Sequence, residues 1–337
     1  MMHSNMFFKI VIVIISFLIT TNLFGVSAQE YIDYDKCYNE AISYGQIGER
    51  LFSNGQWDDA IEYYNKTLQT FESCGDEYNK AVTLMKIGVV YAHKNELDTA
   101  LRYLQESYDI FLKDEEIDES EIATMANMGK VYLMKGESDK AIESFNKALS
   151  WSEERNDTRG MALAIANIGG YYREMGDYPT AIEYHLQAAD LFNKSGDLRE
   201  QGGQLRNVGF AYYLSNDFEE SLYYYDEAEY FFSIINDDIL LDYLSYLRGL
   251  SYNSIATYNK RIDNFNESIK YSELALSESI KAQRSGPNGF ILGINTLLEM
   301  GDVYSLQGYH ENAIDSYQTA LYFLEVYKRG SETTDED

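Results

Sequence analysis

The chain contains very little proline, cysteine or histidine. Its 337 residues include 2 prolines, 2 cysteines and 4 histidines. Proline interrupts helices and central strands, so its scarcity favours a protein of long helices. Histidine and cysteine supply most metal centres and many nucleophilic sites, and the few that are present lie far apart in the sequence. We therefore predict no catalytic site, no metal site and no cofactor.

Basic residues are also scarce. The 27 Lys and Arg stand against 55 Asp and Glu, which gives a formal net charge of −28. Such a charge repels phosphate backbones and anionic lipids, so neither nucleic acid nor a membrane surface is an expected partner. The hydrophobic content of 45% is typical of a globular protein and argues against disorder.

The first 28 residues have the layout of a secretory signal peptide. Lys9 precedes the apolar run 10–19, and Val26-Ser27-Ala28 forms a small-residue cleavage site. The run is shorter than the roughly 20 residues that cross a bilayer, which favours cleavage over retention as an anchor. We predict export, to the periplasm or outside the cell, without stable membrane insertion.

A repeat of about 40 residues occupies the rest of the chain. Its units share a glycine, an aromatic residue or Leu three positions later, and Ala or Ser twelve positions after the glycine. Six units match without a gap: Gly48/Leu51/Ala60, Gly88/Tyr91/Ala100, Gly129/Tyr132/Ala141, Gly169/Tyr172/Ala181, Gly209/Tyr212/Ser221 and Gly301/Tyr304/Ala313. A seventh unit, Gly249/Tyr252, needs seven extra residues before Ser268. We place these extra residues within 253–266, and we expect a kink or mobile joint at the Gly/Pro cluster 284–289.

Each unit has the pattern of two amphipathic helices joined by a turn. In the third unit, Ile122, Met125 and Met128 recur at helical spacing, and a second helical stretch begins near Ala141 after a turn at Gly136. A single helical hairpin cannot bury its own apolar face, so the hairpins are expected to stack.

These residues resemble the tetratricopeptide repeat. The resemblance lies in Met128-Gly129, Tyr132, Gly136, Ala141, Phe145 and Ala148, and the same positions recur in the other units. The period exceeds the usual 34 residues of the family and the closing proline is absent. The longer helices are similar to those of Pins/LGN and kinesin light chain, and to repeats in exported portions of bacterial sensors and regulators.

The resemblance implies an all-α fold, a right-handed α-solenoid of about seven stacked helix-turn-helix repeats over residues 29–329. The repeats are expected near 31–75, 76–115, 116–156, 157–196, 197–236, 237–283 and 288–328, with an acidic disordered tail at 330–337. The family is a binding scaffold without chemistry of its own, so we do not expect an enzyme.

By the same resemblance, the first helix of each repeat lines a concave groove that binds a peptide. Asparagine occupies the position two before the glycine in three successive repeats, and its amide can pair with a peptide backbone. Basic residues at or beside groove positions favour a partner with acidic residues or a free carboxylate, and two aromatic residues are expected as anchors. The predicted groove residues are Lys86, Asn127, Lys130, Asn167, Arg173, Arg206, Asn207, Phe210 and Tyr213. Two alternatives stay open, namely that the amides bridge neighbouring helices and that the basic residues fall there by chance.

We therefore predict an exported, non-enzymatic scaffold that binds a peptide or protein segment in its groove. The alternative is an extracytoplasmic ligand-sensing module of a signalling or regulatory system. An apolar edge at Tyr317, Leu321 and Leu324 suggests a homodimer or contact with a further domain, or simply a small exposed edge.

The two cysteines lie in the first repeat. Cys37 and Cys74 are each about 18 residues from the turn at Gly55-Gln56, so an antiparallel hairpin brings them level. We expect a disulfide, which suits an exported protein, although two separate thiols stay open.

Overall fold

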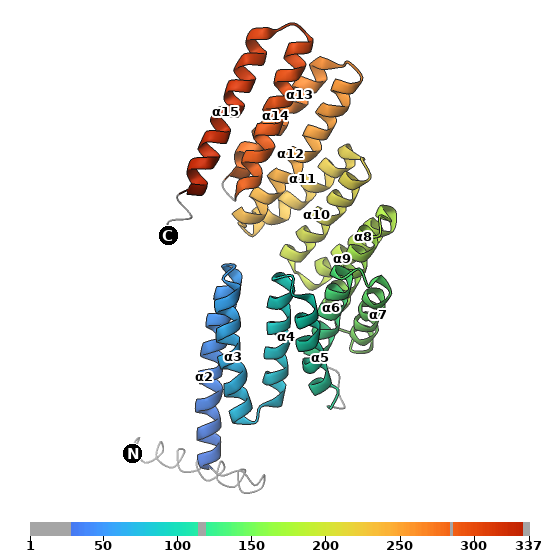
Figure 1. The fold of residues 1–337 in the computed structure, drawn as a ribbon. Coiled ribbons are helices and arrows are strands. Elements are labelled where there is room, and N and C mark those ends of the chain that lie inside the picture. Colours follow the sequence, from blue (N-terminus) through green and yellow to red (C-terminus); the bar gives the residue numbers. More distant parts are fainter. Residues whose placement is uncertain (1–27, 114–118, 284–285, 333–337) are drawn as a thin grey trace, which may run out of the picture. The chain divides into compact units, whose positions relative to one another are not determined.

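The computed structural model describes residues 28–113, 119–283 and 286–332, and within these segments the chain forms fourteen helices and no strand. The helices pair in chain order as α2 (Ala28–Ser53) with α3 (Trp57–Cys74), α4 (Glu77–His93) with α5 (Leu97–Phe111), α6 (Glu119–Met134) with α7 (Ser138–Glu154), α8 (Thr158–Glu174) with α9 (Tyr178–Ser195), α10 (Leu198–Leu214) with α11 (Phe218–Ile234), α12 (Asp238–Arg261) with α13 (Phe265–Ala282), and α14 (Pro287–Leu306) with α15 (His310–Glu332). Figure 1 shows α2 with α3, and α14 with α15, as antiparallel hairpins. The expected all-α architecture is confirmed.

Two compact units divide the chain, the first up to Lys147 and the second from Ala148 onward. The expected signal peptide and the last five residues of the acidic tail lie outside the described residues, and so do residues 284 and 285 of the expected joint. The helix α15 continues to Glu332, three residues into the segment expected as a tail.

Small residues at the glycine position allow close helix contact within each hairpin. A Cβ at Gly129 would lie 2.6 Å from the ring of Phe145, and one at Gly209 would lie 2.7 Å from Tyr225. The side chain that fills this space comes sixteen residues after the glycine, and Phe145 and Tyr225 are 1% and 0% exposed. The repeated glycine therefore serves packing.

Short turns with a fixed pattern connect the helices. Asp76, Asp157, Asp197 and Asp237 begin the helices that follow them, and each carboxylate accepts a hydrogen bond from a backbone N–H in the first turn. The turn inside each hairpin contains a residue with positive φ, which Gly and Asn adopt most readily. These residues are Gly55, Asn95, Gly136, Gly176, Asn216, Asp263 and Gly308.

The position of that turn corrects the register expected for the irregular hairpin. In the six regular hairpins the positive-φ residue lies seven positions after the glycine, whereas Asp263 lies fourteen after Gly249 and seven after Ala256. Ser268 donates a hydrogen bond of 2.9 Å to the carbonyl oxygen of Ala256, which lies twelve residues before it. Ala256 therefore replaces the glycine of this hairpin, and the seven extra residues are those directly before it, which overlap the predicted range 253–266 only at residues 253–255.

The first hairpin contains a disulfide between Cys37 and Cys74. Their Cα atoms are 6.1 Å apart, and the bond joins the beginning of α2 to the end of α3 across 37 residues of sequence. It closes the hairpin at the end opposite its turn.

Candidate functional site

The expected groove residues divide between the two units, and all of them lie on the first helices of hairpins. Unit 1 contains Lys86, Asn127 and Lys130, and unit 2 contains Asn167, Arg173, Arg206, Asn207, Phe210 and Tyr213.

In unit 1, Asn127 and Lys130 of α6 line a pocket of about 190 Å³ together with Val89, His93 and Met134. This volume is below the roughly 300–1,000 Å³ of typical ligand sites. The pocket has room for a single side chain of a ligand.

Three lysines of unit 1, one on α4 and one directly after each of α4 and α6, form ion pairs with the preceding hairpin. Lys86 pairs with Glu49, Lys94 with Asp58 at 2.7 Å, and Lys135 with Asp98 at 2.6 Å. The acidic partner comes 36 or 37 residues earlier, which is about one repeat, so these pairs join consecutive hairpins. Their positive charge is balanced inside the protein.

In unit 2, α8, α10 and α12 bring aromatic rings and guanidinium groups together on one face. The guanidinium carbon of Arg173 lies 5.7 Å from the ring centroid of Phe210, and Phe210 stacks on Tyr213 with centroids 6.1 Å apart. The guanidinium of Arg206 lies 5.5 Å from the ring of Tyr243. We call these five residues, with Asn207, the α8–α10–α12 face.

Arg206 is the unusual cation of this face. None of the described carboxylates lies within ion-pair distance of its guanidinium, and burial lowers its pKa from the ordinary value. Arg173, by contrast, pairs with the neighbouring Glu174 at 2.9 Å. A desolvated guanidinium without a counter-charge is costly unless a ligand supplies an anion.

A chain of hydrogen bonds connects Arg206 to the interior. Arg206 Nη2 donates to Asn207 Oδ1 at 3.3 Å, Asn207 Nδ2 donates to Gln204 Oε1 at 3.4 Å, and His185 Nδ1 lies 2.9 Å from the same oxygen. Burial lowers the pKa of His185 to about 4, so its ring is neutral near pH 7 and Nδ1 acts as the donor. The chain turns the carbonyl of Asn207 toward Arg206.

The amide of Asn207 therefore bonds within α10. It does not bridge neighbouring helices, because its hydrogen-bond partners, Gln204 and Arg206, belong to its own helix. Asn167 of α8 is half-buried on the corresponding position of its helix.

Sequence reasoning missed Tyr243 in this face and Gln204 in the hydrogen-bond chain behind it. Gln204 is 5% exposed and stands five residues before the glycine, where the regular hairpins of α4 and α6 have Thr83 and Thr124. His185 likewise stands where Phe145 and Tyr225 fill the space beside the glycine. His185 and Gln204 thus differ from the residues at the same positions of other repeats, and they lie on the neighbouring helices α9 and α10. These two differences were the signal that could have revealed the hydrogen-bond chain.

Two other kinds of site find no support in the described part of the chain. No group of three His, Cys, Asp or Glu side chains there is placed to hold a metal ion. None of the described helices combines the length and hydrophobicity needed to cross a membrane.

Comparison with known families gives one consistent match. Models of the tetratricopeptide repeat match residues 39–113, 121–194, 160–229 and 294–323, which together cover more than half of the chain. The curated BBSome complex member BBS4 of Bos taurus is 28% identical over 116 residues, which are 33% of this chain and 19% of that protein. The match spans about a fifth of that relative's length.

Solved structures share the fold at low sequence identity. A Rap protein complexed with Competence and Sporulation Factor has a TM-score of 0.59 and 18% identity, covering 86% of this chain and 76% of that one. The Rap conjugation gene regulator of the plasmid pLS20, in complex with the Phr* peptide, has a TM-score of 0.51 and 18% identity, covering 85% and 73%.

Proposed function

Because the chain belongs to the tetratricopeptide repeat family, we propose that it is a scaffold whose α8–α10–α12 face binds a peptide or protein segment through a carboxylate. The family is generally non-enzymatic, and the fold is shared with Rap proteins, one of which was solved with a peptide. The observation that carries the proposal is Arg206, a desolvated guanidinium with no described carboxylate within ion-pair distance.

The surroundings of Arg206 suit a carboxylate of a peptide. Hydrogen bonds to a charged group are stronger than neutral ones, and guanidinium binds carboxylate in a two-point geometry. Asn207 fixes one side of Arg206, while the rings of Phe210, Tyr213 and Tyr243 offer apolar contact area beside it. Tyr and Arg are enriched among residues that dominate binding energy.

Peptide binding can be tested on an array of octapeptides in free-acid and amidated forms. We expect wild-type protein to prefer acidic or free-acid peptides, and Arg206→Gln to weaken their binding by about tenfold, the loss of one charge-assisted interaction. The matched control is Arg102→Gln, which removes an exposed arginine of α5. Equal binding by both variants would remove the proposal.

Export remains part of this proposal. The arrangement of residues 1–28 favours a cleaved signal peptide, and a disulfide in the first hairpin suits an oxidising compartment. Mass spectrometry of protein recovered from the exported fraction should give a mature N-terminus near Gln29. Recovery of the intact leader from the cytosol would contradict export.

A further inference from the structure

The irregular helix α12 contains two residues that can take the place of the repeat glycine, and we call each of them an anchor position of the helix. Counted from the beginning of the helix, Gly249 corresponds to Gly88, Gly169 and Gly209, each eleven residues after the first residue of its own helix. Counted from the turn that follows, Ala256 is the anchor instead. Ala256 therefore takes the glycine position toward the partner helix α13, whereas Gly249 keeps the position counted from the beginning of the helix and lies against α13 and α14.

Seven residues separate these anchors, and they lengthen α12 by about 10 Å. At about 100° per residue, seven residues fall roughly 20° short of two full turns, so both anchors lie on nearly the same side of the helix. A Cβ at Gly249 would meet Leu292 of α14, whereas the glycines of the regular hairpins meet the residue sixteen positions later. The insertion thus preserves the packing face and shifts α13 along the helix direction, and the last turns of α12 extend past the beginning of α11.

We call the place where the lengthened end of α12 lies beside the beginning of α11 the step in α12. A cavity of about 840 Å³ lies at this step. Its walls are the turn and first residues of α11, the last three turns of α12, and the beginning of α13. This volume falls in the range of ligand-binding clefts. Phe218 on its wall also contacts Tyr213, with ring centroids 5.8 Å apart, so the cavity adjoins the α8–α10–α12 face.

Acidic and aromatic side chains line the cavity. Its charged residues are Asp217, Glu219, Glu220 and Glu267 against Arg261. Glu219 and Glu220 are exposed and form no ion pair with any described residue. Tyr258 is 60% exposed, and Tyr271 lies on the same lining. The Tyr271 ring already stacks on Tyr252 and has the Lys270 ammonium 5.2 Å from its centroid, so the open ring is that of Tyr258. Carboxylates beside an open tyrosine ring attract ammonium and guanidinium groups through charge and through cation–π contact.

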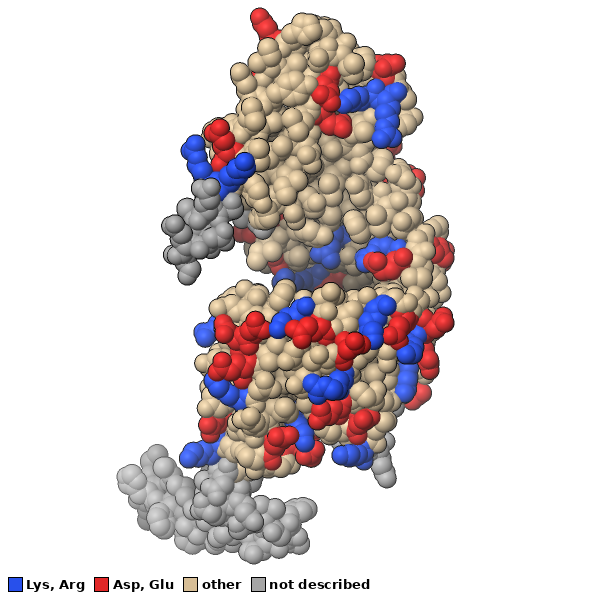
Figure 2. All heavy atoms as spheres, in the orientation of Figure 1, with Lys and Arg blue, Asp and Glu red and all other residues tan. Residues whose placement is uncertain are grey.

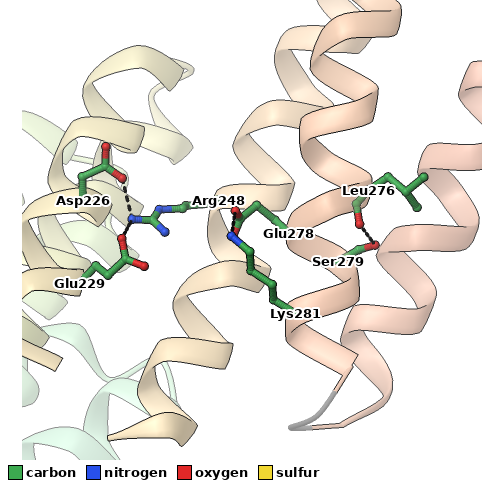
Figure 3. Close-up of polar contacts among 7 residues, drawn as sticks. All are labelled: Asp226, Glu229, Arg248, Leu276, Glu278, Ser279 and Lys281. Atoms are coloured by element: carbon green, nitrogen blue, oxygen red, sulfur yellow. Dashed lines mark hydrogen bonds and ion pairs between the residues drawn. The ribbon is translucent and has the colours of Figure 1, made fainter. Parts of the chain in front are cut away.

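A buried arginine holds the two main walls together. Arg248 of α12 is 6% exposed, at the helix position where Ile168 and Val208 are buried in the regular hairpins. It donates to Asp226 at 2.6 Å and to Glu229, both on α11 (Figure 3). In the same view Glu278 and Lys281 of α13 form a pair beside it.

These contacts give the cavity a fixed frame. Asn253, the first α12 residue of the lining, comes five residues after Arg248, about 7.5 Å along the helix. Arg248 is the buried member of these pairs, whereas the side chains of Asp226 and Glu229 are 69% and 45% exposed. Separation of α11 from α12 would leave the buried guanidinium without either carboxylate, so the ion pairs oppose it. The ion pairs therefore hold the α11 and α12 walls together, and the turn at Asn216 and Asp217 completes the lining.

We propose that the cavity at the step in α12 is a second binding site, which takes a Lys- or Arg-bearing peptide segment of a protein partner. It is opposite in charge preference to the α8–α10–α12 face and does not rest on the function proposed for that face. The basic side chains pair with Glu219 and Glu220, and the exposed ring of Tyr258 contacts their aliphatic and cationic parts.

The test measures fluorescence anisotropy of labelled penta-lysine at physiological salt, with penta-glutamate as the opposite probe. We expect Glu219→Gln with Glu220→Gln to weaken penta-lysine binding about fivefold, the effect of two exposed ion pairs. The control variant Glu227→Gln with Glu273→Gln removes the same charge from exposed positions outside the cavity and is expected to leave binding within about twofold. Arg206→Gln is likewise expected to leave it unchanged.

A deletion tests the structural origin of the site. Removal of residues 250–256 joins Gly249 to Thr257 and restores the twelve-residue spacing to Ser268. We expect this variant to lose the binding that Glu219 and Glu220 provide. If it does not fold, the paired glutamine variants and Tyr258→Ala decide the question.

The proposal is overturned by any of three results. Equal weakening in the cavity and control variants would mean that penta-lysine binds only the general negative charge. Binding of penta-glutamate at the same positions, or full binding by a folded deletion variant, would exclude the site.

Discussion

Ion pairs between consecutive hairpins occur in both units, in unit 2 between Arg159 and Asp197 and between Arg199 and Asp237, but the units differ at one cation, Arg206. In unit 1, Lys94 and Lys135 form ion pairs with the preceding hairpin, and a disulfide closes the first hairpin. In unit 2, Arg206 has no described carboxylate within ion-pair distance and is desolvated. Figure 2 shows acidic and basic side chains interspersed over α2–α5, whereas the visible surface of α12–α15 is largely uncharged. Within one repeat pattern, a cation can therefore either join consecutive hairpins through an ion pair or lie without a described carboxylate within ion-pair distance.

The largest expected effect concerns the crosslink of unit 1. Replacement of Cys37 and Cys74 by Ser frees a loop of 37 residues, which lowers the free energy of unfolding of unit 1 by about 4 kcal/mol in the chain-entropy model. Hydrogen exchange should show faster opening in α2 and α3 and unchanged protection in α12–α15. Uniform loss of protection along the chain would mean that the two units do not differ in this respect.

A somewhat smaller effect concerns the buried histidine of unit 2. The folded pKa of His185 is about 4, below its ordinary value of 6.5, so the unfolded chain binds the proton more readily. Its contribution is present above pH 6.5 and is lost as the pH falls toward 4, by roughly 3 kcal/mol. Urea unfolding monitored in unit 2 should show this loss.

The repeat itself supplies a variant that removes this dependence. His185→Phe with Gln204→Thr restores the residues that other hairpins have at these positions, Phe145 and Thr124. The double variant should flatten the stability profile between pH 6.5 and 4, while His310→Phe, at an exposed position, should retain it. An unchanged profile in the double variant would assign the pH dependence to other groups.

Substitution of one cation in each unit should change the stability of the two units in opposite directions. Arg206→Met removes a desolvated charge without a partner and is expected to raise the stability of unit 2 by about 1 kcal/mol while it weakens ligand binding. Lys94→Met breaks an ion pair to Asp58 and should lower the stability of unit 1 slightly. Chemical denaturation of both variants checks this prediction, and equal signs would contradict it.

The smallest expected effect concerns self-association through α15. Leu321 is 61% exposed, whereas Ala189 at the same repeat position in α9 is 5% exposed. If this edge pairs with a second copy, Leu321→Glu shifts the protein toward monomer in sedimentation velocity, and Glu325→Gln on the same helix does not. A monomeric wild-type protein would exclude the homodimer.

The helices and their pairing could be predicted from residue spacing. Apolar residues at helical intervals, Gly129 with Phe145 and Gly209 with Tyr225 sixteen positions apart, and turns at Gly136 and Gly176 are local features that each repeat carries in its own sequence. Of the site, the positions of Arg206, Asn207, Phe210 and Tyr213 on one helix followed from the same periodicity.

The partners of those residues could not be predicted, because they come from other helices. The contact of Arg206 with Tyr243 joins α10 to α12, and the bond between His185 and Gln204 joins α9 to α10. The sequence around Arg206 does not indicate that it has no carboxylate partner. The sequence around Lys94 does not indicate its ion pair with Asp58 either, yet the structure contains that pair. Charge balance depends on distances between hairpins.

Each repeat carries the pattern of its own helices, turns and small packing positions, so local residue spacing is enough to predict helical hairpins. The place of the seven extra residues follows from tertiary contacts, since both Gly249 and Ala256 satisfy the local pattern and the choice depends on which neighbouring helix each one meets. Tertiary contacts also establish that Lys94 pairs with the preceding hairpin and that Arg206 has no described carboxylate within ion-pair distance, because the distances between hairpins exist only in the folded chain.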